Sequence, residues 1–160
     1  MKKLFGILLL CASCGGKLTD EQRQRLHEGM ATQDIKRVSD ADLQKAAMTY
    51  AKSVLTEIEG VDKNLKLGAE TDSLAHLRNV RIYSISPEDT LNPIERKLVE
   101  AYVSAARPDQ AGDNLQKTEG DSLLFTRPVF IEHAGGGSQF SHAIGIKMSK
   151  KTVVLSMPKP

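Results

Sequence analysis

Both cysteines of this 160-residue chain, Cys11 and Cys14, lie near its amino terminus. The remainder of the chain therefore has no internal disulfide available and must be held together by a hydrophobic core. Hydrophobic residues make up 40% of the sequence, which is sufficient for the core of one ordinary globular domain. Aromatic residues make up only 4% and tryptophan is absent, so we expect the core to be mainly aliphatic.

The amino-terminal segment has the pattern of an export signal. Two lysines precede an apolar run over residues 4–10, which is too short to span a membrane as a helix. The run leads into Cys11-Ala12-Ser13-Cys14. This segment resembles the lipobox of bacterial lipoproteins, with Cys11 in place of the usual Leu and Ser13 in place of the usual Gly or Ala.

The lipobox resemblance implies that residues 1–13 are a lipoprotein signal peptide and that Cys14 carries diacylglyceryl and acyl (palmitate-type) chains. Residues 14–18 would then be the lipidated cysteine and a short tether to a bacterial membrane. The chain is expected in the cell envelope, on the periplasmic face or at the cell surface. The alternative is an ordinary cleaved secretory signal with an incidental cysteine. A lone thiol in an oxidising compartment would be a liability, which favours lipidation.

Removal of this signal would leave a chain without net charge. Without Lys2 and Lys3, the 22 basic residues fall to 20, which equals the 20 acidic residues. Nucleic-acid-binding domains normally carry a basic stripe or a high pI, so we expect no nucleic-acid partner. No basic cluster is present that could hold the chain on an anionic membrane. We therefore expect membrane attachment through lipid alone.

Helical patterns dominate the first part of the mature chain. Thr19 with Gln22 forms a capping-box pattern that predicts a helix start. Ser39 is the predicted N-cap of an amphipathic helix over 40–59, in which apolar residues recur at steps of three and four. We expect this helix to end at Gly60.

The later part of the chain changes from helical to strand patterns. A short helix over 70–77 and a strand over 79–86 are predicted first. Asn92-Pro93-x-Glu95 then combines an N-cap, a proline at the first helical position and a capping-box glutamate, which predicts another helix. Short connections typical of antiparallel hairpins separate the last four predicted strands, 115–118, 122–131, 141–148 and 152–157.

This order of elements predicts an α+β fold, with N-terminal helices packed on a C-terminal antiparallel sheet. We expect residues 19–160 to form a single domain of this kind.

Histidines flank a glycine run in one predicted hairpin. Glu132 and His133 precede Gly135–Gly137, and His142 follows it. If the hairpin brought them together, two imidazoles and a carboxylate could bind Zn²⁺ or iron. The spacing matches no metal motif, however, and histidines on a surface loop are the alternative. The glycine run leads into a strand rather than a helix, so we interpret it as a hairpin loop rather than a phosphate-binding loop.

Arg81 and Arg127 each interrupt an apolar stretch that is predicted to be a strand. A guanidinium that projects into a pocket can bind a carboxylate bidentately, so both are candidate ligand-binding residues. The alternative is an edge-strand arginine that faces water. No Gly-x-Ser-x-Gly nucleophile motif is present and Cys14 is assigned to lipid, so no catalytic residue is predicted.

Four segments follow one another in a recognisable order: Arg81-Ile82-Tyr83-Ser84-Ile85-Ser86-Pro87, Asn92-Pro93-x-Glu95, a turn at Gly120 and Phe125-Thr126-Arg127-Pro128-Val129. Together they resemble the extracytoplasmic PAS-like domains that act as c-type haem-binding sensors. The resemblance would span about residues 40–157 and implies a PAS-like form and a sensor-like role. That family attaches haem through Cys-x-x-Cys-His, whereas residues 131–137 here read Ile-Glu-His-Ala-Gly-Gly-Gly. Covalent haem is therefore excluded, and no cofactor is expected.

These patterns lead us to expect a membrane-anchored lipoprotein with a non-catalytic, PAS-like domain. It would bind a small molecule or an envelope protein through the sheet face or the glycine loop, with Arg81, Arg127, His133 and His142 as candidate contacts. One alternative is a metal- or haem-handling protein or an enzyme that uses Glu132 and the two histidines. Another is a structural envelope protein without a ligand.

Overall fold

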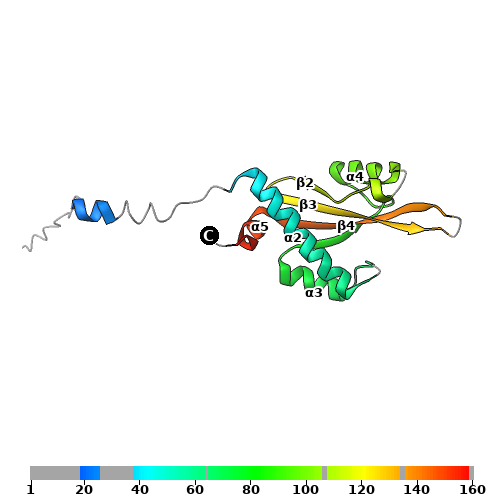
Figure 1. The fold of residues 1–160 in the computed structure, drawn as a ribbon, viewed down its shortest axis with the longest axis horizontal. Helices are drawn as coiled ribbons and strands as arrows, with labels where there is room; N and C mark the ends of the chain where they lie inside the picture. Colours follow the sequence, from blue (N-terminus) through cyan, green and yellow to red (C-terminus); the bar gives the residue numbers. More distant parts are fainter. Residues whose placement is uncertain (1–18, 26–37, 64, 106–107, 134–135, 159–160) are drawn as a thin grey trace, which may run out of the picture. The chain divides into compact units, whose positions relative to one another are not determined.

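The computed structural model describes residues 19–25, 38–63, 65–105, 108–133 and 136–158. The chain forms two compact units, Met1–Arg37 and Val38–Pro160. In the first unit residues 20–25 are helical, and Thr19 and Gln22 exchange the reciprocal hydrogen bonds of the predicted capping box. The second unit contains the helices and strands described below (Figure 1).

The longest helix, α2 (Asp40–Val61), begins at its predicted N-cap. The Ser39 hydroxyl accepts a hydrogen bond of 3.1 Å from the N–H of the third helical residue. Contrary to expectation, the helix does not end at Gly60, which lies in its last turn. The Asp62 N–H closes this turn by donating to the Ile58 carbonyl. An exposed glycine inside a helix costs only about 1 kcal/mol, and the apolar packing of the preceding turns outweighs this cost.

The next elements are α3 (Ala69–Arg78), β1 (Arg81–Ile85) and α4 (Pro93–Ser104). Asn79 ends α3 with φ of 51°, a left-handed conformation that asparagine tolerates, and so turns the chain into β1. The start of α4 has the predicted capping box. The Asn92 side chain accepts from backbone N–H groups of the first turn, and the Glu95 carboxylate accepts from the Asn92 N–H.

One four-stranded antiparallel sheet unites β1 with three later strands. After a short 3₁₀ turn at Pro108–Gln110 come β2 (Asn114–Lys117), β3 (Ser122–Glu132) and β4 (Ser138–Ser149). The spatial order is β1-β4-β3-β2, so the last three strands form consecutive hairpins while β1 pairs with the far side of β4. The predicted α+β class with an antiparallel sheet is thereby confirmed.

The last predicted strand, 152–157, is wrong, because the chain forms a helix there, α5 (Lys150–Ser156). The Ser149 side chain accepts from the Thr152 N–H and caps this helix. The valines of this segment suggested a strand, but only its Thr152 and Val153 are buried. Burial of only two residues suits a short helix against α2 better than a fifth strand, which would need a buried face along its whole length.

The two faces of the sheet are buried by different helices. Successive side chains of a strand point to opposite faces. Leu123 and Phe125 on β3 accordingly pack in one core with α2, whereas Leu124 between them packs in another core with α4. We call these the α2 core and the α4 core; Figure 1 shows the two helices on different sides of the sheet.

A β-bulge shapes the α4 core. The register of β3 and β4 shifts between Val129, which pairs with His142, and Phe130, which pairs with Phe140. The extra residue on β4, Ser141, turns Phe140 toward α4, where its ring lies 5.6 Å from that of Tyr102 and 5.9 Å from that of Phe130. The bulge therefore adds an aromatic cluster to one end of a core that is otherwise aliphatic.

Gly145, at the middle of β4, allows β1 side chains to lie directly on the sheet. A Cβ atom there would come within 2.9 Å of Ile85 Cδ1 and 3.2 Å of Tyr83 Cζ. Ile85 is only 2% exposed, so it has no room to move away.

We therefore predict that Gly145→Ala destabilises the domain by about 1–3 kcal/mol, the usual range for forcing an extra methyl group into a packed core. Urea unfolding, followed by circular dichroism, measures this difference. Gly137→Ala is the matched control, since nothing lies within 4 Å of the Cβ position there. Equal midpoints for the two variants would contradict the tight packing of β1 on β4.

Candidate functional site

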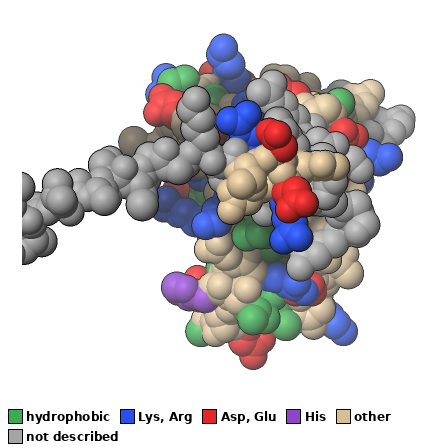
Figure 2. Space-filling view, turned by 90° about the vertical axis from the view of Figure 1, so that its left-hand side faces the viewer, with side chains coloured by type: hydrophobic (Ala, Val, Ile, Leu, Met, Phe, Trp, Pro, Cys, Tyr) green, Lys and Arg blue, Asp and Glu red, His purple; other side chains and the backbone are tan. Residues whose placement is uncertain are grey.

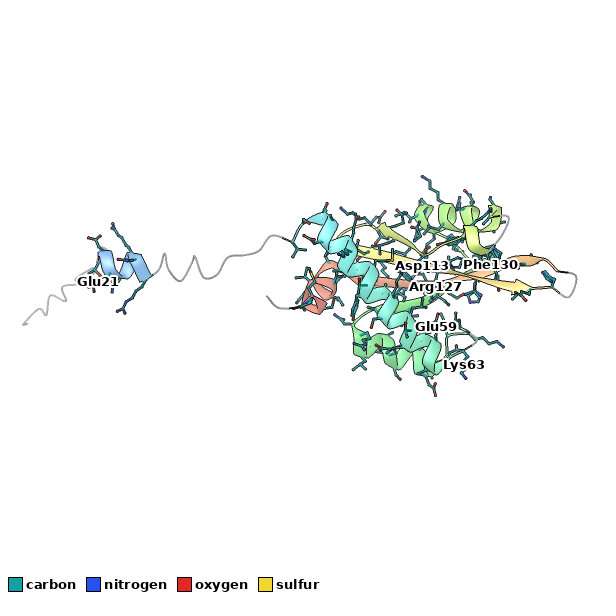
Figure 3. The ribbon with its side chains drawn as sticks, viewed as in Figure 1. Glu21, Glu59, Lys63, Asp113, Arg127 and Phe130 are labelled. Carbon is teal, nitrogen blue, oxygen red and sulfur yellow. The ribbon has the colours of Figure 1, made fainter. Side chains whose placement is uncertain are left out.

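Arg127 was predicted as a ligand-binding residue, but its guanidinium is already taken up by carboxylates of this chain. Its Nε and Nη2 atoms donate to the two carboxylate oxygens of Asp113 at 2.7 and 2.8 Å, and its Nη1 donates to Glu59 at 3.0 Å. In Figure 3 Arg127 lies between these two acidic side chains. The Asp113 carboxylate also lies 3.7 Å from the Lys52 Nζ.

This cluster ties α2 to the sheet. Glu59 and Lys52 belong to α2, whereas Arg127 belongs to β3 and Asp113 directly precedes β2. The bidentate hydrogen bonds from Arg127 lower the pKa of Asp113 below its usual value, despite partial burial, which acts in the opposite direction. Since β3 is an interior strand and its arginine is paired, we correct the ligand-binding assignment of Arg127 to a structural one.

The predicted histidine site is not assembled. Glu132 pairs with Ser138 at the end of the β3–β4 ladder, whereas His142 pairs with Val129, three residues back along β3. The Nε2 of His133 donates to Gln139 at 3.0 Å.

His142 is likewise engaged elsewhere. Its Nε2 donates to the Leu65 carbonyl at 3.3 Å, and its Nδ1 accepts from the Ser141 hydroxyl at 3.1 Å. Among the described residues, no group of three or more His, Cys, Asp or Glu side chains is placed to hold a metal ion. The alternative in which the hairpin joins Glu132, His133 and His142 into one metal site is therefore not supported by these residues. Residues 134–135 of the predicted glycine loop lie outside the described residues.

Arg81, the other candidate arginine, borders an open cleft of about 420 Å³. The cleft lies between β1, the following loop and the first turn of α4. Lys147 of the neighbouring strand β4 also lines it. We call it the Arg81 cleft. Its walls are formed by Arg81, Tyr83, Ser84, Ile85, Asp89, Thr90, Leu91, Asn92, Glu95 and Lys147.

The two cations of this cleft are adjacent because of the β1–β4 register, in which Arg81 and Lys147 are direct partners. The guanidinium of Arg81 lies over the ring of Tyr83, with Cζ 5.3 Å from the ring centroid. A cation–π contact of this kind orients a guanidinium without neutralising its charge. Arg81 is thus an exposed edge-strand residue, as the alternative expectation had it, and also part of a cleft wall.

Tyr83 connects the basic side of the cleft to its acidic side. Its hydroxyl donates to Glu95 Oε1 at 2.8 Å, while Glu95 Oε2 accepts from the Asn92 N–H at 3.1 Å. Burial, followed by this hydrogen bond to a carboxylate, raises the pKa of Tyr83. The phenol therefore stays protonated at neutral pH and fixes the Glu95 carboxylate in place.

Charges of both signs in the Arg81 cleft have no ion-pair partner within the described part of the chain. No carboxylate there pairs with Arg81 or Lys147, and no cation pairs with Asp89 or Glu95. Glu95 is the notable case, because it is only 9% exposed. Buried charges are normally paired, since removal from water costs free energy that a partner must offset.

Sequence reasoning found Arg81 but missed Lys147, Glu95 and Tyr83 as parts of one site. Glu95 was identified only as a capping-box residue, and this role is correct. Lys147 belongs to a strand more than sixty residues away from Arg81, and only the β1–β4 register brings the two together. Lys147 could have been recognised as a charged residue inside an otherwise apolar predicted strand. The same pattern made Arg81 and Arg127 candidates.

In the part of the chain that the structure describes, neither the surface charge nor the amino-terminal segment points to a further site. In the view of Figure 2, acidic and basic side chains of the described residues lie interspersed. None of the helices in the described ranges is both long and apolar enough to cross a bilayer. Cys14, the predicted lipidation site, lies outside these ranges.

We predict that Arg127→Met destabilises the domain by about 1–3 kcal/mol at pH 7, because it leaves the partly buried Asp113 carboxylate without its main donor. The stabilising effect of the wild-type pair is fully present above the ordinary aspartate pKa of about 3.9 and is lost as the pH falls through the lower folded-state pKa. The difference in unfolding free energy between the wild type and Arg127→Met should therefore shrink on acidification. Urea unfolding at pH 7 and at pH 3 measures it.

Lys117→Met serves as the control for this prediction. It removes an ion pair with Asp40 whose side chains are 47% and 74% exposed, so it should leave the stability almost unchanged at either pH. A gap for Arg127→Met that is the same at both pH values would show that Asp113 is not the group involved.

Comparisons of the chain with protein-family models, with curated protein sequences and with solved structures give no match.

Proposed function

We propose that this chain is a membrane-anchored bacterial lipoprotein whose α+β domain, of PAS-like form, is a non-catalytic binding module. The module would take up a small molecule that carries a carboxylate group, in the Arg81 cleft. The observation that supports this proposal is the pair of adjacent cations, Arg81 and Lys147, which line one cleft and have no carboxylate partner among the described residues.

The chemistry of these two cations suits a carboxylate. The planar fork of a guanidinium binds two carboxylate oxygens at once, and a neighbouring ammonium group adds a point charge. The Tyr83 ring holds the Arg81 guanidinium at the cleft wall, so less conformational entropy is lost when a ligand binds. Arg127 provides the contrast within this chain, because Asp113 already occupies its fork.

A binding role is favoured over catalysis by the composition of the cleft. Its aliphatic hydroxyl side chains, Ser84 and Thr90, have no histidine beside them in the lining that could act as a general base. The two histidines that were considered for chemistry lie outside this lining, and they are hydrogen-bonded to Gln139 and to the Leu65 carbonyl.

The anchor is tested at Cys14. We predict that Cys14→Ala abolishes incorporation of radioactive palmitate and releases the protein from the membrane fraction, because several acyl chains at about 0.8 kcal/mol per buried CH₂ provide the attachment. Cys11→Ala is the matched control and should still be labelled. If Cys14→Ala is labelled and sediments with membranes, the anchor lies elsewhere.

The binding role is tested by thermal shift on the full chain purified in detergent. A ligand that binds only the native state raises the unfolding midpoint, so we predict a rise with at least one member of a panel of small carboxylic and amino acids. Arg81→Ala should weaken binding of that compound about 10- to 100-fold, as expected for the loss of a charged hydrogen-bonding partner.

Arg96→Ala is the matched control for this experiment. Arg96 is an exposed arginine of α4 that lines a neighbouring cleft of about 560 Å³ rather than the Arg81 cleft. Its loss should leave the affinity unchanged. A panel without any effect on the midpoint, or equal effects of the two arginine substitutions, would favour a structural envelope role instead.

A further inference from the structure

The Arg81 cleft contains opposite charges that do not neutralise one another. Arg81 and Lys147 line its basic side, and Glu95 and Asp89 line its acidic side. No ion pair joins the two sides, although they share one space of about 420 Å³. Such an arrangement is complementary to a ligand that carries both charges.

Tyr83 explains why the two sides stay apart. Arg81 lies over the face of the Tyr83 ring, while Glu95 accepts from the hydroxyl at the end of the same ring. The guanidinium and the carboxylate are therefore both held by one rigid side chain, the first at its ring face and the second at its hydroxyl. Glu95 cannot swing toward the arginine, because its second oxygen also holds the Asn92 N–H at the start of α4.

Both acidic side chains can still accept further hydrogen bonds. The two oxygens of a carboxylate offer about four lone-pair sites. Glu95 uses one on Tyr83 and one on the Asn92 N–H, and Asp89 uses one on the Ser86 N–H at 2.7 Å. A cationic amine would fill the remaining sites and offset the charge of a carboxylate that is only 9% exposed.

We infer that the ligand of the Arg81 cleft is a zwitterion of the α-amino acid class, an inference that rests on the binding role proposed above. The carboxylate of the ligand binds Arg81 and Lys147, and its ammonium group binds Glu95 and Asp89. An α-amino acid carries both groups on one carbon atom, so its two charges lie close together, and both can bind within this one cleft.

Ligands with a single kind of charge fit this cleft less well. A simple carboxylic acid would leave Glu95 without a cation, and the second carboxylate of a diacid would meet Glu95 and Asp89 as like charges. An amine without a carboxylate would be repelled by Arg81 and Lys147. The cleft thus favours the zwitterion both by attraction and by exclusion of the alternatives.

The test uses the full chain in detergent and isothermal titration calorimetry. Each of the twenty protein amino acids is titrated first, together with acetate and succinate. The amino acid that binds most tightly is then compared with its N-acetyl derivative, which lacks the ammonium charge, and its amide, which lacks the carboxylate. We expect each derivative to bind at least about tenfold more weakly than the parent compound.

Glu95→Gln separates the charge of this residue from its capping role, since glutamine also serves in a capping box. The variant should weaken binding of the amino acid about tenfold or more but leave binding of its N-acetyl derivative unchanged. Glu100→Gln, an exposed carboxylate of the same helix that lines the neighbouring cleft, is the matched control and should have no effect.

The outcomes distinguish the two proposals. If acetate, succinate or the N-acetyl derivative binds as tightly as the best amino acid, the zwitterion inference is wrong and the carboxylate-binding role remains. If only the amide or other amines bind, both are wrong as stated. If none of the compounds binds, the inference and the proposed binding role fail together.

Discussion

The β3–β4 hairpin is the interaction on which the rest of this structure depends. Its ladder runs from Ser122–Ser149 to Glu132–Ser138 and is covered by α2 on one face and α4 on the other. The residues that the structure describes contain no cysteine, so burial of both faces has to supply the stability that a disulfide would otherwise add to them. β1 pairs with β4, β2 pairs with β3, and α5 continues directly from β4, whereas α3 contacts α2 and β1.

Burial of both faces also explains where polar side chains are permitted. Within the interior strand β3, Thr126 is fully buried but bonds to the Tyr102 hydroxyl at 2.7 Å, and Arg127 is held by Asp113 and Glu59. Pro128 follows where β2 no longer pairs with β3, so its missing N–H interrupts no ladder on that side. Thr126 and Arg127 of this hairpin are thus satisfied within the fold. Unpaired charges of both signs come together instead in the Arg81 cleft, at the edge strand β1.

Sequence patterns predicted most of the fold because most of its signals are local. The caps at Ser39 and Asn92 are short hydrogen-bonding motifs, and the apolar stretches of β1 and β3 can each be read from a single strand. The helix α5 was missed because its β-branched residues favour a strand, and its actual state depends on a contact with α2 that is distant in sequence. The site was predictable only in part for the same reason: Arg81 could be recognised alone, whereas Lys147 joins it only through a register that no local pattern contains.

Glu95 shows how a local folding signal and a proposed binding group can coincide in one residue. As the third residue of α4 it completes the capping box, which any glutamate or glutamine in that position can do. Its near-complete burial and its hydrogen bond from Tyr83 are not needed for capping, and both lower the freedom of its carboxylate. Gly145 contributes to the same arrangement, because only a residue without a side chain lets the Tyr83 ring lie so close to β4. Close packing on Gly145 thus fixes the Tyr83 ring. The ring in turn holds Arg81 at its face and Glu95 at its hydroxyl. The arrangement of opposite charges on which the proposed zwitterion binding rests therefore depends on the packing of the core.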